Sequence, residues 1–261
     1  MARNTGNHHP FDAREDFFYQ AAAGRFNSII DDIARIAGDI DDEVVSDRRI
    51  ASLFSDLVGR RMEEEGFRPN LELPRNASEH LWFDEHTLTA YEQGAEDAES
   101  LLEATGHAPG TRSIEESPNH QDALDRLFGD QRQHWHGVAD DVEDGIEQRV
   151  LDVLDAEDGT VRDAKDAVAD RLDHVGKYRS RLIAESETGR AYNEALIAEY
   201  EEAGVEEVRV EEVEWQTAGD HRVCESCASM AGTYDLDEAK RMLRAGEFPH
   251  HPRCRCLFAP A

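Results

Sequence analysis

The chain has 261 residues and a formal net charge of −30, because 58 acidic residues face only 28 basic ones. Such a charge repels DNA and anionic membranes at low salt and suits a solvent of molar salt, where the Debye length is about 3 Å. Hydrophobic residues still make up 39% of the chain and recur with helical spacing, which favours a folded cytoplasmic protein of a halophile over a disordered acidic chain.

Neither a membrane segment nor a signal peptide is predicted. Residues 1–10 are polar, and no apolar run approaches the roughly 18 residues that a membrane span requires. The length permits one large domain or two modest ones. The runs of Asp and Glu are expected to be solvated faces.

Apolar residues three or four positions apart predict helices over most of the chain before residue 204. The expected helices span about residues 12–40, 46–65, 78–102, 120–155, 161–174 and 178–203. Gly66 is expected to end the second helix in the left-handed conformation. The stripe on the fourth helix, which includes Gln131, resembles a bundle seam. We therefore expect residues 1–158 to form an antiparallel helical region with one long helix, which serves as a partner-binding scaffold.

A small α+β module is expected in residues 159–261, so the predicted fold class is α+β and mainly helical. Apolar residues occupy every second position at Val208 and Val210, and again at Val213 and Trp215, but even-numbered positions are apolar in the first pair and odd-numbered positions in the second. This shift predicts a bulge or a junction of two strands. A short strand is predicted at 233–234 and a helix at 236–244.

All four cysteines lie near the C-terminus, in two knuckles. Cys224 and Cys227 are three positions apart, so that one turn brings both thiols to a single ion; Cys254 and Cys256 would face the same side of a strand. His251 lies just before the second pair. Zinc prefers four Cys or His ligands in a tetrahedron, and two separated knuckles supply such a set.

Five candidate ligands compete for four positions on the zinc ion. The preferred set is Cys224, Cys227, His251 and one of Cys254 or Cys256, and an all-cysteine set is the alternative. A disulfide pair or four free thiols remain the other interpretations, although cysteines in an intracellular protein favour metal. A site closed by four protein ligands is structural rather than catalytic.

The C-terminal sequence resembles the minor head proteins of tailed phages, the phage Mu protein F-like head morphogenesis family. The resemblance covers about residues 175–260 and is carried, in order, by Ile183–Asn193, Tyr200–Gly204, Trp215–Cys227, Ala231-Gly232 and Pro249–Cys256. It implies a structural protein of the virion, without catalytic residues, that associates with the portal vertex during head assembly. Its implied partners are the portal protein, the major capsid protein and packaged DNA. With the acidic surface, it suggests a tailed virus or provirus of a haloarchaeon, assembled in the host cytoplasm.

Two other functions are compatible with the residues. A metal-dependent hydrolase or transferase would use Glu185, Glu187, Arg190 and Asn193 on one helix, with Asp220 and His221 beside the cysteines. In the structural interpretation, the side chains of Glu187, Asn193 and Asp220 instead support the metal loop. Trp215 and Phe258 are then expected to pack beside the ion.

A zinc-stapled nucleic-acid-binding module is the third hypothesis. It would use the arginines that give the C-terminal module a local basic character, namely Arg222, Arg241, Arg244, Arg253 and Arg255.

Overall fold

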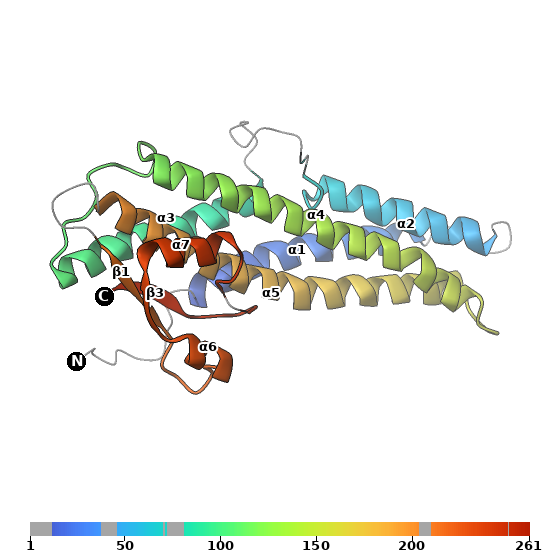
Figure 1. Cartoon of the computed structure of the whole chain (residues 1–261). Helices are drawn as coiled ribbons and strands as arrows, with labels where there is room; N and C mark the ends of the chain where they lie inside the picture. Colours follow the sequence, from blue (N-terminus) through green and yellow to red (C-terminus); the bar gives the residue numbers. More distant parts are fainter. Residues whose placement is uncertain (1–11, 38–45, 70, 72–80, 204–209, 250) are drawn as a thin grey trace. The chain divides into compact units, whose positions relative to one another are not determined.

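The computed structural model describes residues 12–37, 46–69, 71, 81–203, 210–249 and 251–261 (Figure 1). The chain divides into two compact units, each built from separate stretches of sequence. The sheet-bearing unit comprises Met1–Phe17, Trp82–Gly129 and Leu182–Ala261, and the helical unit comprises Phe18–Leu81 and Asp130–Arg181. The predicted boundary after residue 158 follows chain order and does not coincide with this division. As a functional boundary it stays a prediction.

The order of elements confirms the predicted fold class, a mainly helical α+β protein with a long helix. The elements are α1 (Asp12–Ala37), α2 (Asp47–Glu64), α3 (Trp82–Thr105), α4 (Pro118–Leu154), α5 (Val161–Ala203), β1 (Glu212–Gln216), α6 (Glu225–Met230), β2 (Gly232–Asp235), α7 (Leu236–Arg244) and β3 (Leu257–Pro260). None of the described helices is both long enough and apolar enough to cross a membrane.

Turn residues place several helix boundaries where the sequence predicts them. Ser46 precedes α2 in an extended conformation, and Gly66 has a φ of 77°, as expected for a glycine that ends a helix. The predicted helical residues 38–40, the start of the third helix near Ser78 and the bulge near Val208 lie outside the described residues.

The prediction of two helices between residues 161 and 203 is wrong, because α5 is one helix of 43 residues. Gly176 lies in its interior and allows α1 to pack closely. A Cβ at this position would lie 2.8 Å from the Cβ of Phe26. The glycine therefore reflects a close helix–helix contact in the helical unit rather than a break.

Aromatic side chains fill the core of the helical unit. The rings of Phe26 and Phe67 are 4.6 Å apart, and those of Phe67 and Trp135 are 5.4 Å apart. All three are essentially inaccessible to solvent. Each buried aromatic side chain of this kind contributes about 1.5–3 kcal/mol through the apolar area that it removes from water.

Gln131 is an exception in this core. Its side chain is fully buried, and neither its amide nitrogen nor its oxygen has a hydrogen-bond partner in the described part of the chain. Replacing Gln131 with Leu removes these unpaired polar atoms at similar volume, so we expect the free energy of unfolding to rise by about 1–2 kcal/mol. Urea denaturation measures this change. Gln133→Leu, at an exposed position of the same helix, should change stability by less than about 0.5 kcal/mol. A destabilised Gln131→Leu variant would contradict the prediction.

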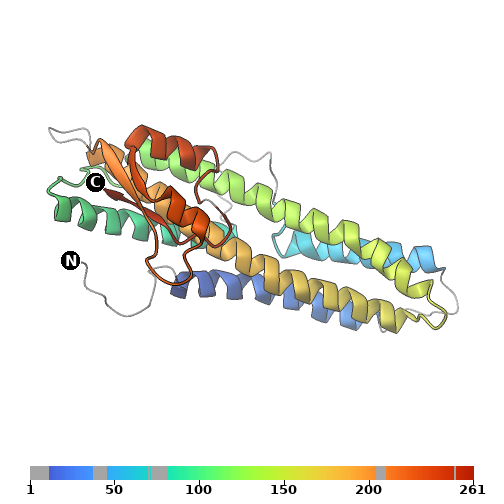
Figure 2. The same cartoon turned by 60° about the horizontal axis from the view of Figure 1, so that its bottom comes forward.

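The sheet-bearing unit is organised around a three-stranded antiparallel sheet with the order β2-β1-β3. Val213 and Trp215 of β1 are buried, whereas their neighbours along the strand are exposed, as expected for a sheet with one face on a core. Helix α7 packs on the sheet (Figures 1 and 2). The hydroxyl of Tyr200 on α5 donates to the carbonyl of Phe258 at 3.1 Å, which attaches β3 to the helix.

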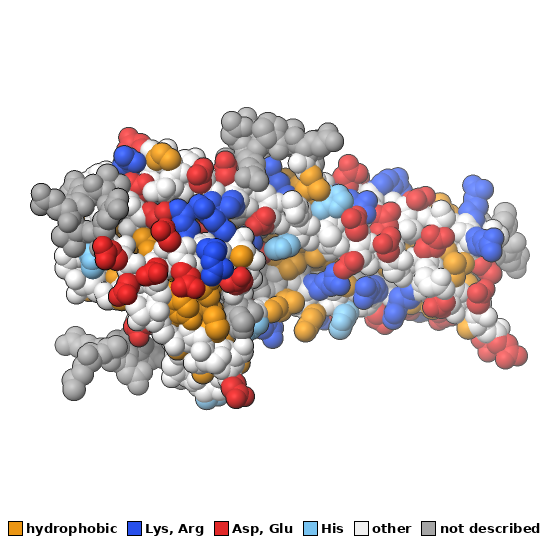
Figure 3. Space-filling model, in the orientation of Figure 1, with side chains coloured by type: hydrophobic (Ala, Val, Ile, Leu, Met, Phe, Trp, Pro, Cys, Tyr) orange, Lys and Arg blue, Asp and Glu red, His pale blue; other side chains and the backbone are white. Residues whose placement is uncertain are grey.

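The last turns of α5 are buried on every side, because all residues from 191 to 200 are buried. This stretch includes acidic residues, so the expectation that the Asp and Glu runs are solvated is wrong here. Glu194, Glu199 and Glu202 are each about 4% exposed or less. Glu194 pairs with Arg126 at 2.9 Å, and Glu202 accepts from the hydroxyl of Ser117. On the face of Figure 3, by contrast, acidic side chains lie at the surface interleaved with basic ones.

A buried series of hydrogen bonds joins helices α3, α4 and α5 near the end of α5. The Tyr91 hydroxyl lies 2.9 Å from Nδ1 of His120, and Nε2 of His120 lies 3.0 Å from Oε2 of Glu199. The backbone N–H of Gly110 donates to the other oxygen of Glu199 at 2.9 Å. The carboxylate is thereby satisfied on both oxygens, which is the condition for burying it without a large free-energy cost.

Candidate metal centre

The first knuckle is built by the start of α6. Cys224 is the N-cap residue of this helix, and its sulfur accepts a hydrogen bond from the backbone N–H of Cys227 at 3.2 Å. This N–H lowers the pKa of the Cys224 thiol. The cap geometry places the two sulfurs on the same side of the first helical turn, as the three-residue spacing predicts.

The second knuckle is a turn rather than a strand. The backbone N–H of Cys254 donates to the carbonyl of His251 at 3.1 Å, and Arg253 between them has a positive φ of 66°. The prediction that Cys254 and Cys256 lie on a strand is therefore wrong, because β3 begins only at Leu257. Both sulfur-bearing residues are nevertheless buried.

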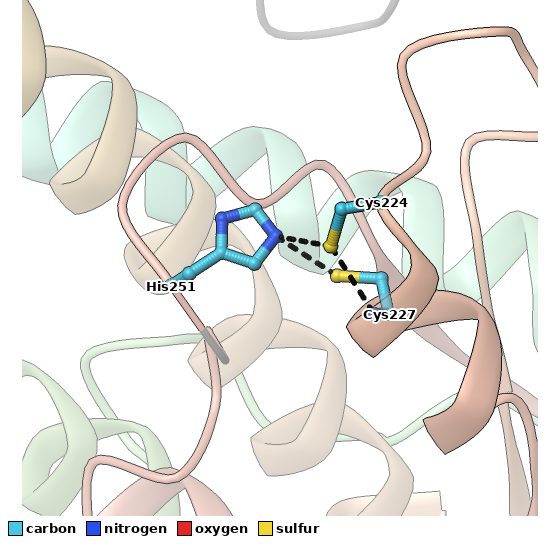
Figure 4. A group of neighbouring side chains, drawn as sticks. All are labelled: Cys224, Cys227 and His251. Carbon is cyan, nitrogen blue, oxygen red and sulfur yellow. Dashed lines mark hydrogen bonds between the residues drawn. The ribbon is translucent and has the colours of Figure 1, made fainter.

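The two knuckles converge, and the five candidate ligands form two groups that share Cys227. Figure 4 shows the group made by Cys224, Cys227 and His251. Nε2 of His251 lies 3.2 Å from the sulfur of Cys224 and 3.0 Å from that of Cys227. The sulfurs of Cys227 and Cys254 are 3.7 Å apart. Two sets of three donor atoms result, one made by Cys224, Cys227 and His251 and the other by Cys227, Cys254 and Cys256.

The imidazole of His251 is oriented for coordination through Nε2. Its Nδ1 lies 2.7 Å from the carbonyl oxygen of Pro252, which can only accept, so the proton is on Nδ1. In the neutral ring, Nε2 then carries a lone pair that points at two sulfurs. A backbone carbonyl that accepts from the distal nitrogen is the usual neighbour of a metal-bound histidine.

The donor distances fit a tetrahedral metal ion. Bonds of about 2.3 Å to sulfur and about 2.0–2.1 Å to nitrogen place tetrahedral ligand atoms about 3.6–3.8 Å apart. The sulfurs of Cys227 and Cys254, 3.7 Å apart, match this range, and the two separations between nitrogen and sulfur, 3.0 and 3.2 Å, are shorter. Burial and the neighbouring Cys254 raise the pKa of the Cys227 thiol to about 12. A divalent ion reverses this effect because coordination deprotonates the thiol. The cluster can therefore hold a metal ion.

Asn193 fixes the second knuckle to α5. Its amide nitrogen donates to the carbonyl of Gly189 at 2.8 Å and to that of Cys256 at 3.3 Å, and its oxygen accepts from the backbone N–H of Phe258 at 3.1 Å. One buried side chain thus satisfies backbone groups on both sides of the junction between the knuckle and β3.

Replacing Asn193 with Ala should destabilise the protein by about 2–4 kcal/mol, because the N–H of Phe258 and the carbonyl of Cys256 lose their partner in a buried place. Asn193→Asp keeps the acceptor for Phe258 but turns a buried carboxylate oxygen toward the carbonyls of Gly189 and Cys256, so it should cost at least as much as the alanine variant. Chemical denaturation of both variants measures the difference. An Asn193→Ala variant as stable as the parent chain would show that the amide does not hold the knuckle.

Two ion pairs flank the second knuckle. Arg255 forms two contacts of 2.7 Å with the carboxylate of Asp220, and Arg253 pairs with Glu185 of α5. The Arg255 guanidinium holds the pKa of Asp220 well below its usual range. The contact of Asp220 is with Arg255, and its supporting role at the metal loop stays a prediction; the contact of Glu185 with Arg253 was not predicted. The alternation of Arg and Cys in residues 253–256 is the one sequence feature that could have indicated these pairs.

The other supporting residues lie near the knuckles. Trp215 and Phe258 belong to the same buried cluster as Cys227, Cys254 and Cys256, and their rings are 5.7 Å apart. Glu187 is buried on α5, and its supporting role stays a prediction.

Residues 143–259 match the family model described as Phage Mu protein F like protein. The resemblance inferred from the motifs is thereby confirmed for the C-terminal portion of the chain, and the match begins further upstream, within α4. Similarity to this family indicates a phage head morphogenesis protein. No curated protein and no solved structure matches the chain.

Proposed function

We propose that this protein is a minor head protein of a tailed virus and acts in head assembly at the portal vertex. The observation that carries the proposal is the family match over residues 143–259, which includes both knuckles of the candidate metal centre. In this account the protein resides in the virion, in the capsid interior or at the portal vertex, and in the host cytoplasm during assembly. The helical region of residues 1–158 provides the surface for partners.

Zinc is the metal that the donor set favours. Thiolates and imidazole in tetrahedral arrangement select zinc among the common divalent ions. Cys224, Cys227 and His251 supply three ligands, and the second knuckle supplies a fourth sulfur. A zinc ion with four protein ligands has no open position for a substrate, so its role is to close the fold.

The contacts of the acidic and amide side chains support a scaffold rather than an enzyme. A hydrolase or transferase would need Glu185, Asn193 and Asp220 to face a substrate. Instead, Glu185 and Asp220 pair with arginines of the second knuckle, and Asn193 holds its backbone. These side chains thus attach the knuckle to the rest of the unit.

The arginines of the C-terminal module favour protein over nucleic-acid partners. Arg222 and Arg255 lie beside Asp220, Arg253 pairs with Glu185, and Arg241 pairs with Glu238 and Glu247. The charge of these four arginines is largely neutralised within the module, which leaves little of it for phosphate contacts. The main proposed partner is accordingly the portal protein, and the second is the major capsid protein. Packaged DNA is a third proposed partner, which these ion pairs favour less.

Fractionation of infected or induced cells in molar salt tests this proposal. The protein should sediment with heads, at low copy number, and should co-purify with the portal protein after the heads are dissociated. Heads assembled without portal protein provide the control and should lose the protein. Recovery as a free chain, absent from heads and from portal complexes, would contradict the proposal.

We also infer a halophilic origin from the net charge of −30. Self-repulsion of the acidic surface is screened as salt rises, so we expect the thermal midpoint to increase from about 0.1 M to molar KCl. Differential scanning calorimetry measures it. A midpoint that does not change with KCl would contradict the halophilic assignment.

A further inference from the structure

The candidate metal centre holds five donor residues, whereas a tetrahedral zinc ion takes four. We propose that Cys256 is the residue left out of the coordination sphere, and that it packs as an uncoordinated thiol behind the site. The fourth ligand is then Cys254. This inference rests on the proposed zinc centre and assigns the role of each cysteine within it.

The two knuckles have the same ligand spacing when Cys254 is the ligand, although the first is a helical turn and the second contains Arg253 at a positive φ. Cys224 and Cys227 are three positions apart in a turn closed by a hydrogen bond from the N–H of Ala228 to the carbonyl of Cys224. His251 and Cys254 are also three positions apart, in a turn closed by their own backbone hydrogen bond. Each turn thus presents its first and fourth side chains, and the two turns together supply four donors.

The distances favour the same set. The sulfurs of Cys227 and Cys254 are 3.7 Å apart, which matches the roughly 3.8 Å between two thiolates on one tetrahedral zinc ion. Nε2 of His251 faces the sulfurs of both Cys224 and Cys227. A set that omitted Cys224 or His251 would leave unused a donor atom that lies 3.2 Å from a ligand atom.

Cys256, in contrast, is fixed as part of the core. It lies beyond the turn, its carbonyl accepts from the amide of Asn193, and the strand β3 starts at the next residue. Its side chain is 4% exposed, as is that of Cys254, and it belongs to the buried cluster that contains Trp215 and Phe258. A buried cysteine among aromatic rings behaves as a small apolar side chain with a weak S–H donor.

Two single substitutions in the full-length chain distinguish the roles. Cys254→Ser should weaken zinc binding by more than the roughly 10–100-fold that loss of a hydrogen-bonded neighbour of a ligand causes. Cys256→Ser should stay within that range and should retain one zinc ion per chain. Zinc content by plasma mass spectrometry and competition with a chromophoric chelator measure both. Far-UV circular dichroism verifies that each variant keeps its helices.

Spectroscopy gives a second readout, which for the unmodified chain does not depend on the folding of a variant. Zinc-edge X-ray absorption should show three sulfur ligands and one nitrogen ligand, and four sulfurs would overturn the assignment. With cobalt in place of zinc, the sulfur-to-metal charge-transfer band should keep its intensity in the Cys256→Ser variant. In the Cys254→Ser variant, the band should lose the intensity that one thiolate ligand contributes. The reverse pattern would overturn the inference. A wild-type chain that binds no zinc would instead contradict the proposed metal centre itself.

Discussion

Replacing Cys227 with Ser is expected to unfold the C-terminal part of the sheet-bearing unit. Cys227 belongs to both sets of three donor atoms, so its loss disrupts every arrangement of ligands that the site allows. A structural zinc ion contributes about 10–16 kcal/mol to the folding of isolated zinc-binding peptides, which is comparable to the typical stability of about 5–15 kcal/mol of a whole domain. Removal of the metal by a strong chelator should have the same effect in the parent chain.

Amide hydrogen exchange followed by mass spectrometry measures this effect segment by segment. Peptides that cover β1 and β3 should lose protection, whereas peptides from residues 130–181 of the helical unit should keep it. Ser229→Ala, at an exposed position of the same α6 helix, serves as the control and should leave protection unchanged. Full protection of β1 and β3 in the Cys227→Ser variant would show that the knuckles do not depend on a shared ion.

Replacing His120 with Ala is expected to lower the free energy of unfolding by about 3–5 kcal/mol. The substitution leaves the carboxylate of Glu199 and the hydroxyl of Tyr91 buried, each without the partner on which it depends. Burial and the nearby carboxylate of Glu194 raise the pKa of Tyr91 well above its usual value. The carboxylate of Glu199 can only accept, so in the neutral imidazole the proton is on Nε2 and the Tyr91 hydroxyl donates to Nδ1.

Denaturant titration of a small set of variants tests this chain of hydrogen bonds. Tyr91→Phe removes only one hydroxyl and should cost about 0.5–1.5 kcal/mol. The double variant of His120→Ala with Glu199→Gln should be less destabilised than the sum of the two single variants, because the second substitution removes the unpaired charge. Strict additivity, or a cost of His120→Ala below about 1 kcal/mol, would show that the contact does not carry this energy.

The sequence predicted most helices because their apolar residues recur every three or four positions and their ends carry turn residues. Helix α7 spans the predicted residues 236–244, and α4 lies within two residues of its prediction at each end. The continuity of α5 could not be predicted, because a glycine such as Gly176 can either end a helix or lie inside one where a side chain from another helix packs closely. Here it lies inside the helix, against Phe26. Only the partner, far away in the chain, decides between the two.

The acidic residues of α5 illustrate the same limit. Glu199 and Glu202 occur in a strongly acidic stretch and resemble solvated residues in sequence. Their partners, such as His120 and Ser117, are 79 and 85 positions away. Local periodicity contains no information about such pairs, so the burial of these carboxylates became evident only from the fold.

The grouping of the cysteines and His251 was more predictable than the structure that holds it. The spacing of Cys224 and Cys227 indicated the first knuckle, whereas the second is a turn and not the strand that the spacing of Cys254 and Cys256 suggested. The contacts of Arg253 and Arg255 with acidic residues depend on which segments become neighbours, and they were not foreseen as ion pairs.

The metal content of the protein tests most directly whether the two knuckles meet at one ion. The protein should be purified in molar salt without added metal and dialysed against a weak chelator before elemental analysis and intact-mass measurement. We predict one zinc ion per chain and four cysteines that all react with an alkylating agent after denaturation. A metal-free chain whose mass is lower by a hydrogen pair for each disulfide would contradict the account.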